Sequence, residues 1–281
     1  MKTHFIRPLV LAALFVIFGT LGWSQAVSPA TAAFALGAQD QGSDNGKEFH
    51  WTGKLSPDQV VVIKDINGDI DATGSSSSDE VEVTAVKSGR GAEDVRIQVV
   101  KLNDGVMICA VYPGFFGSSN DCESNSHWGN NNHNNAKVDF TIHMPQNLRF
   151  TGKNVNGGVH AESMGRYVEA ASVNGTIRIS TSSWASASSV NGSIYARMGR
   201  TDWSGDLEFK TVNGSIKLEL PTNLSADIDF NSVNGHLESD FPVTMQGSMG
   251  RHSVHGTIGG GGRSLQIRTV NGSGELRKEA I

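Results

Sequence analysis

Four oxygen-bearing side chains alternate along one short stretch and could supply ligands for a calcium ion. They are Asp65, Asn67, Asp69 and Asp71. Calcium prefers carboxylate and amide oxygens, but the common calcium loop needs a Gly at its sixth position and a Glu at its twelfth. Here Gly68 stands fourth, and the twelfth position holds no Glu. Alternate residues of a strand share a face. The stretch therefore indicates a solvated strand face around a turn.

Histidines and acidic residues give no better centre for chemistry. His127 lies near His133, and His252 near His255, but neither pair has the further ligands of a zinc site. We therefore expect no metal and no cofactor. Acidic residues are scattered, whereas glycoside hydrolysis needs a carboxylate pair on one face. Nor is there a phosphate loop or a Ser-His-Asp spacing, so we predict no catalytic residues and a protein that is not an enzyme.

Aromatic side chains are the remaining candidates for ligand contact. Exposed aromatic rings could stack on sugars, although such residues are also ordinary core material. The candidates are Tyr167, Trp184, Tyr195, Trp203, Trp51 and Trp128.

The two cysteines, Cys109 and Cys122, are an even, small number in a chain that begins like an exported protein. In an oxidising compartment such a pair favours a disulfide, which would close a short loop. Free or metal-binding thiols are the alternative.

A five-residue pattern determines where all these side chains can lie. It reads apolar, Asn, Gly, any residue, apolar, and from Asn156 onward it recurs after 18, 17, 22, 21, 21 and 16 residues. Such a recurring unit indicates a repeat architecture. The predicted corner residues are Asn67 and Gly68, Asn156 and Gly157, Asn174 and Gly175, Asn191 and Gly192, Asn213 and Gly214, Asn234 and Gly235, His255 and Gly256, and Asn271 and Gly272.

Two arrangements would accommodate these pairs, because Gly and Asn tolerate left-handed backbone better than other residues. In the first, an antiparallel hairpin meander, Lys210 would face Lys217 and Glu208 would face Glu219. Like charges directly opposite one another destabilise a strand pair.

The second arrangement, which we favour, is a parallel β-solenoid resembling a β-helix or β-roll, with Asn-Gly corners between two strands of each coil. Successive coils would stack in parallel, and Asn side chains would hydrogen-bond from coil to coil. The Ser/Thr-Val step before each Asn breaks the alternation, so we expect this Val to turn inward. Additional strands precede the repeats, and the all-β chain shows no helix pattern.

The chain divides into three parts. Residues 1–26 resemble a secretory signal peptide, since Lys2 and Arg7 precede an uncharged apolar run too short for a comfortable membrane span. Cleavage after residue 32 and an uncleaved anchor are the alternatives. Residues 27–47 read as a flexible leader, and residues 48–281 as one all-β repeat domain with a long Asn-rich loop at 113–136.

Export and charge limit the partners. Loss of Lys2 and Arg7 lowers the basic residues from 23 to 21 against 28 acidic ones, so the mature charge is −7. Nucleic-acid binders carry basic stripes, so we expect no nucleic-acid partner. No second long apolar segment exists, and we expect no transmembrane segment in the mature chain. The destination would be the periplasm, the cell surface or the extracellular space.

Three features together resemble a bacterial adhesin-like β-strand-repeat family, a domain of unknown function. These are the Val-Asn-Gly-x-Ile repeats, the strand from Val138 to Pro145 and the earlier motif from Ile66 to Ile70. The resemblance covers roughly residues 48–276. It implies an exported, solenoid-like domain at the cell envelope and no catalytic residues. The Asn-rich loop departs from the compact family pattern.

These observations predict a non-catalytic, adhesin-like protein that binds or scaffolds at the bacterial envelope. A glycan or a protein of the envelope is the expected class of ligand, and the oligomeric state stays open. A carbohydrate-active enzyme on a β-helix scaffold and an envelope-stress or self-assembling scaffold protein are the alternatives.

Overall fold

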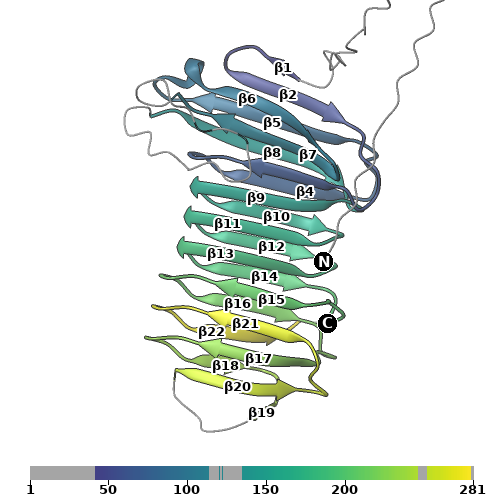
Figure 1. Cartoon of the computed structure of the whole chain (residues 1–281), viewed down its shortest axis with the longest axis vertical. Coiled ribbons are helices and arrows are strands. Elements are labelled where there is room, and N and C mark those ends of the chain that lie inside the picture. The colour runs from purple at the N-terminus through teal and green to yellow at the C-terminus, as the bar shows by residue number, and fades with distance from the viewer. Residues whose placement is uncertain (1–41, 114–119, 121, 123–134, 246–251, 280–281) are drawn as a thin grey trace, which may run out of the picture. The chain divides into compact units, whose positions relative to one another are not determined.

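A computed structural model describes residues 42–113, 120, 122, 135–245 and 252–279. The described chain is all-β, with two sheets of 11 strands each (Figure 1). Its helical content within these ranges is one 3-10 turn, η2 (Ala92–Asp94). None of the helices in the described ranges is long and apolar enough to cross a bilayer.

The strands of each sheet follow a definite spatial order. Sheet A runs β1 (Ser43–Asp44), β2 (Glu48–Gly53), β5 (Val81–Ser88), β8 (Lys137–Pro145), β4 (Ile70–Ser75), β10 (Val159–Met164), β12 (Ile177–Thr181), β14 (Ile194–Met198), β16 (Ile216–Leu220), β22 (Gly274–Lys278), β18 (Leu237–Ser239). Sheet B runs β19 (Val243–Met245), β20 (Ser253–Ile258), β17 (Ala226–Asn231), β21 (Ser264–Arg268), β15 (Asp206–Lys210), β13 (Ala185–Asn191), β11 (Val168–Asn174), β9 (Arg149–Asn156), β3 (Val60–Lys64), β7 (Gly105–Val111), β6 (Arg96–Leu102).

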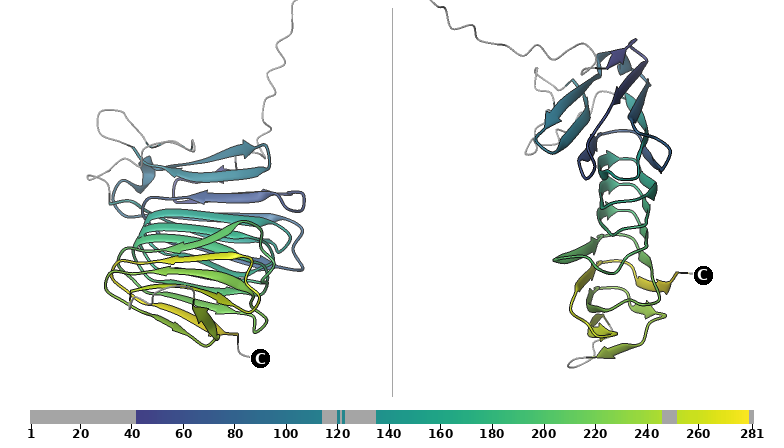
Figure 2. Two further views of the ribbon diagram at one scale, coloured as in Figure 1. Left: turned by 60° about the horizontal axis from the view of Figure 1, so that its bottom comes forward. Right: turned by 90° about the vertical axis from the view of Figure 1, so that its right-hand side faces the viewer.

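Each coil of the repeat consists of a strand of sheet B, an Asn-Gly corner and a strand of sheet A. The coil β11–β12 pairs in parallel with β9–β10 on one side and with β13–β14 on the other. In Figure 1 the strands β9, β11 and β13 end one below another along the same edge, where the Asn-Gly corners follow them, and Figure 2 shows the stacked coils from two further sides. The predicted parallel solenoid is therefore confirmed, and the hairpin meander is wrong for the repeats. Antiparallel pairs occur at the two ends of the sheets.

Alternation along the strands fills the space between the sheets. At five corners the apolar residue that follows begins a strand of sheet A and points inward. Equivalent residues pair across neighbouring strands, so they form a continuous row of buried side chains. This row comprises Ile70, Val159, Ile177, Ile194 and Ile216, each fully buried.

The spatial order of the coils differs from their order in the chain. The last coil, β21–β22, lies between the coils β15–β16 and β17–β18 (Figure 1). The expectation that successive coils stack in chain order is therefore wrong at this end. The reason is that β19 and β20 pair antiparallel beside β17, so the chain passes the end of the stack and then returns into it.

One predicted corner is not a corner. His255 and Gly256 lie inside β20, opposite Asp229 and Ile228 of the antiparallel strand β17. His255 instead faces Asp229 across this antiparallel pair, and its Nδ1 lies 3.2 Å from a carboxylate oxygen of Asp229.

The N-terminal part of the described chain differs in one respect from the predicted boundaries. Ser43 and Asp44 form β1 and pair with β2, although they fall in the predicted leader, residues 27–47. The predicted signal peptide, residues 1–26, lies outside the described residues, as does most of the Asn-rich loop at 113–136. The cysteines that bracket part of this loop, Cys109 and Cys122, form a disulfide with their Cα atoms 5.9 Å apart.

Candidate functional site

The corner asparagines form one continuous ladder of side-chain hydrogen bonds. In each step the Nδ2 of one Asn donates to the Oδ1 of the Asn in the neighbouring coil. All of these side-chain hydrogen bonds run in the same direction along the stack, and they link each corner to the next. The donor–acceptor pairs are Asn156 to Asn67 (2.7 Å), Asn174 to Asn156 (2.8 Å), Asn191 to Asn174 (2.8 Å), Asn213 to Asn191 (2.8 Å), Asn271 to Asn213 (2.7 Å) and Asn234 to Asn271 (2.8 Å).

The glycines that follow these asparagines are required by close approach between coils. A Cβ on Gly192 would lie 1.9 Å from the carbonyl oxygen of Gly175, and one on Gly157 would lie 1.7 Å from that of Gly68. No corner Asn has positive φ, because the described non-Gly residues with positive φ are Asp58 and Ser163. A left-handed Asn is therefore not the reason for the Asn-Gly pairs.

The residue two positions before each corner Asn points inward, and where it is Ser or Thr its hydroxyl donates a hydrogen bond to a backbone carbonyl of the neighbouring coil. Thr211 donates its hydroxyl to the carbonyl of Gly192 at 2.8 Å, and Ser172 donates to that of Gly157 at 2.9 Å. A buried carbonyl without a partner is costly, so a small hydroxyl side chain is favoured here.

The Val before each Asn consequently points outward, and the prediction that it turns inward is wrong. Alternation continues through the corner, with Ser or Thr inside and Val outside. Val173, Val190, Val212 and Val270 are each about two-fifths exposed, and Val233 is 61% exposed. With Val155, the first four line a groove of about 790 Å³ on the outer face of sheet B. This row of Val side chains is an apolar surface.

The alternating acidic stretch does not converge on a metal site. Asp65 is buried, and its Oδ1 accepts the hydroxyl of Tyr112 at 2.9 Å. Asn67 belongs to the ladder, while Asp71 pairs with His160 at 2.8 Å on the outside. Within the described ranges no group of three or more His, Cys, Asp or Glu side chains could hold an ion. The pair His127 and His133 lies outside those ranges.

One of the candidate aromatic residues is well exposed. Trp51 and Trp203 are buried, Trp184 and Tyr167 pack partly buried against the core, and Trp128 lies outside the described residues. The side chain of Tyr195 is 43% exposed on the outer face of sheet A.

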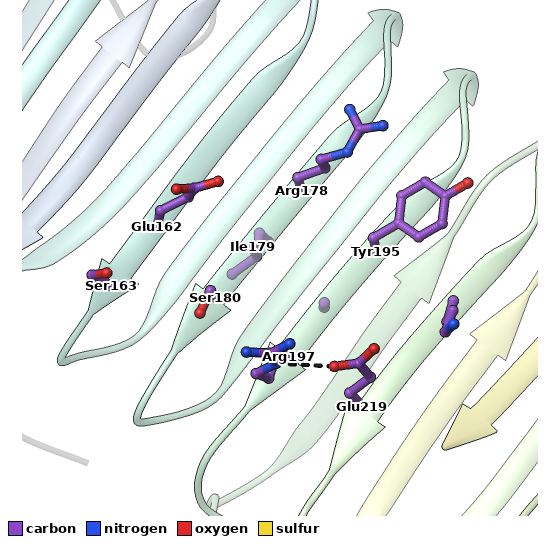
Figure 3. Close-up of a pocket in the computed structure, with 10 residues that line it drawn as sticks. Glu162, Ser163, Arg178, Ile179, Ser180, Tyr195, Arg197 and Glu219 are labelled. Carbon is purple, nitrogen blue, oxygen red and sulfur yellow. Dashed lines mark hydrogen bonds and ion pairs between the residues drawn. The ribbon is translucent and has the colours of Figure 1, made fainter. Parts of the chain in front are cut away.

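Tyr195 stands in a shallow depression of about 380 Å³ on that face. Three neighbouring strands place Arg178, Tyr195 and Lys217 side by side in register. Two residues further along the same strands, Arg197 pairs with Glu219. Figure 3 shows the ring of Tyr195 beside Arg178, with Arg197 joined to Glu219. The depression is therefore formed by one outward row of cation, ring and cation and by a second row with an ion pair.

A β-bulge forms the far end of the depression. The register between β10 and β12 shifts between Ala161 and Met164, which places Glu162 and Ser163 opposite β12. Ser163 has a positive φ of 55° and, together with Glu162, lines the depression. Bulges commonly redirect side chains near functional sites. A positive φ, as at Ser163, is uncommon for a residue with a Cβ.

The charged groups of the depression differ in their pairing. Nε of Arg197 donates to Glu219 at 2.9 Å, and the guanidinium of Arg178 lies 5.4 Å from the ring centroid of Tyr195. Within the described part of the chain, no carboxylate lies within ion-pair distance of Arg178 or Lys217. Two cations therefore flank the ring on a chain whose net charge is −5.

The two carboxylates of the depression are poorly placed for glycoside hydrolysis. Glu162 and Glu219 lie on β10 and β16, which are three strands apart in sheet A. Their backbones are therefore about 14 Å apart at ordinary strand spacing. Hydrolysis needs carboxyl groups about 5 to 9.5 Å apart. Glu219 is also engaged by Arg197.

Residues 55–275 match the model of the family described as Toastrack DUF4097. The chain belongs to this family. Two solved structures are similar to it at low identity. They are a "putative cell adhesion protein" from Clostridium sporogenes (10% identity, 83% of this chain and 100% of that chain, TM-score 0.44) and a "putative adhesin" from Bacteroides fragilis (11% identity, 83% and 97%, TM-score 0.33). A comparison with curated proteins found no match.

In this Toastrack chain, sequence reasoning named Tyr195 but missed the two cations beside it. Each of the three residues directly follows the inward Ile of its corner motif, as in Ile177-Arg178, Ile194-Tyr195 and Ile216-Lys217. Aligning the repeats on their Gly residues would have placed the three side chains in one row.

Proposed function

We propose that this Toastrack protein is an exported, non-catalytic, adhesin-like protein that binds a component of the bacterial envelope through the outer face of sheet A. The observation that carries the proposal is the row of Arg178, Tyr195 and Lys217, an exposed ring between two cations that make no ion pair with a described carboxylate. An exposed aromatic side chain with polar neighbours is typical of interaction sites.

The proposed location rests on two independent features. The first is the signal-peptide pattern of residues 1–26, and the second is the disulfide between Cys109 and Cys122, because disulfides persist mainly in oxidising compartments.

Fractionation and co-sedimentation test this function. Cells producing the full chain are separated into cytoplasmic, periplasmic, envelope and medium fractions. The protein from residue 27 onward is then mixed with isolated envelope and sedimented. We expect the protein outside the cytoplasm, shortened by its signal peptide, and bound to the envelope pellet. Retention in the cytoplasm, or no enrichment in the pellet over a protein of similar size and charge, would overturn the proposal.

A further inference from the structure

We infer that the depression around Tyr195 is a binding site for an acidic polysaccharide, a polymer of sugars that carry carboxylate groups. The inference rests on the proposed function and names the class of ligand for the same face. Three features of the site carry it: the ring with its flanking cations, the spacing of the strands, and the depression's excess of positive charge.

The ring and the two cations match the two kinds of surface that an acidic sugar presents. The C–H faces of a pyranose are apolar and pack against aromatic rings. Tyr195, which is 43% exposed, offers such a ring. A carboxylate pairs with a guanidinium or an ammonium group, and Arg178 and Lys217 stand on either side of the ring.

Packing also orders the site before a ligand arrives. The guanidinium of Arg178 lies over the ring of Tyr195, 5.4 Å from its centroid, which limits the motion of both side chains. The guanidinium of Arg178 has five N–H donors and pairs with no carboxylate of the described residues, so donors remain available to a carboxylate of a ligand. A ligand therefore meets a partly preorganised site.

The spacing of the strands suits a linear polymer that runs along the stack. Neighbouring strands lie about 4.8 Å apart, which is close to the length of one sugar ring. Arg178 and Lys217 are two strands apart, so they are separated by about 10 Å with Tyr195 between them. Each sugar of an extended chain that crosses β12, β14 and β16 would meet one of the three side chains.

The charge of the depression favours an anionic polymer. Arg178, Arg197 and Lys217 outnumber Glu162 and Glu219 among its lining residues, and the ion pair of Arg197 with Glu219 cancels one charge of each sign. A nucleic acid is disfavoured as the ligand, because the chain has an overall charge of −5 and the site offers a single short row of cations.

Affinity electrophoresis with the protein from residue 27 onward tests the inference. Native gels contain polygalacturonate as the acidic polysaccharide, pullulan as a neutral one, or polyglutamate as an acidic polymer without sugars. We expect polygalacturonate to retard the protein, less so at high salt, and the other two polymers to have little effect. Equal retardation by pullulan would refute the need for acidic groups, equal retardation by polyglutamate would refute the saccharide, and no retardation by polygalacturonate at low salt would refute the site.

Matched variants locate the binding. The double variant Arg178→Gln/Lys217→Gln should bind about fivefold more weakly for each cation removed, the usual upper value for an exposed ion pair. Tyr195→Ala should also weaken binding at unchanged charge. The control Lys210→Gln/Arg268→Gln makes the same charge change at two register-paired residues of sheet B and should bind like the unaltered protein.

The results separate this inference from the proposed function. If Arg178→Gln/Lys217→Gln loses sedimentation with the envelope while polygalacturonate does not retard the unaltered protein, the acidic-polysaccharide ligand is refuted and envelope binding through the outer face of sheet A stands. If Arg178→Gln/Lys217→Gln sediments as strongly as the unaltered protein, both proposals are refuted at this face. If the control variant loses polygalacturonate as well, the binding reflects overall charge, and the site is equally refuted. Thermal unfolding of each variant establishes that the fold is intact.

Discussion

Replacement of Asp65 by Asn should change how the stability of the fold depends on pH. Burial holds the pKa of the Asp65 carboxyl far above the usual 3.8, at about 8, although the Tyr112 hydroxyl partly opposes this shift. The neutral acid is therefore the form that the folded protein prefers over most of the physiological pH range.

The position of Asp65 in the corner explains why a neutral acid fits. Asp65 stands two residues before Asn67, the position that Ser172 and Thr211 occupy in other coils. Those residues donate a hydroxyl hydrogen to a backbone carbonyl. A carboxylate can only accept, whereas a protonated carboxyl also has an O–H to donate. Asp65 occupies this position with its Oδ2 buried and without a hydrogen-bond partner among the described residues, so the uncharged form is favoured there.

The sign and size of the effect follow from the shift. Well below pH 3.8 the carboxyl is protonated in both states and costs nothing. As pH rises towards 8, the unfolded chain loses the proton while the folded protein keeps it, so the free energy of unfolding falls by about 1.4 kcal/mol per pH unit. Over the window from 3.8 to about 8 the group alone removes roughly 5 kcal/mol.

The Asp65→Asn variant cannot titrate at this position, so it should lack this loss. We expect the difference in free energy of unfolding, variant minus unaltered protein, to rise by several kcal/mol from pH 4 to pH 8, with the larger part of the rise above pH 5. Urea unfolding followed by Trp fluorescence, with the disulfide intact, measures it. The exposed Asp206→Asn is the control and should shift little. Parallel curves for Asp65→Asn and the unaltered protein would refute the buried neutral acid.

Three further predictions concern the ladder and the stack. Asn191→Ala removes two ladder bonds and should cost about 2 kcal/mol in urea unfolding, whereas Asn234→Ala, at the end of the ladder, removes one and should cost about 1 kcal/mol; equal costs would contradict the ladder. Gly192→Ala drives a Cβ against the Gly175 carbonyl and should lower the free energy of unfolding in urea by at least about 3 kcal/mol. A loss of less than about 1 kcal/mol would contradict this close approach. Deletion of residues 263–281 empties the slot between two coils and should yield aggregates in size-exclusion chromatography; a monomer that unfolds in one cooperative step would contradict the inserted coil.

The repeat could be read from the sequence because the corner imposes the same demand in every coil. Close approach requires Gly, and the ladder requires a side chain that donates and accepts, so Asn-Gly recurs wherever two coils stack. The direction of the Val was wrong for a reason that lies in the backbone. The carbonyl of each corner Gly needs a buried donor, and this need, which no hydrophobic pattern shows, places Ser or Thr inside and Val outside.

The inserted coil and the candidate site could not be read in the same way. All corners share one motif, so Asn271 fits between Asn213 and Asn234 as well as any other corner would, and the motif does not encode which coils are neighbours. Arg178 and Lys217 belong to different coils, and only the register of the parallel strands brings them to the two sides of Tyr195.

The place of the last coil also sets an order of events for the growing chain. Coils from β9–β10 to β15–β16 can be laid down one after another as residues emerge, because each stacks on the one before it. The coil β17–β18 is made next, yet its neighbour β21–β22 is the last segment of the chain. Until residue 278 has been synthesised, the open edges of β15 and β16 face the edges of a coil that they cannot pair with in the native register. The native stack is thus completed by its final segment, and a chain that lacks its C-terminus retains a gap inside the stack.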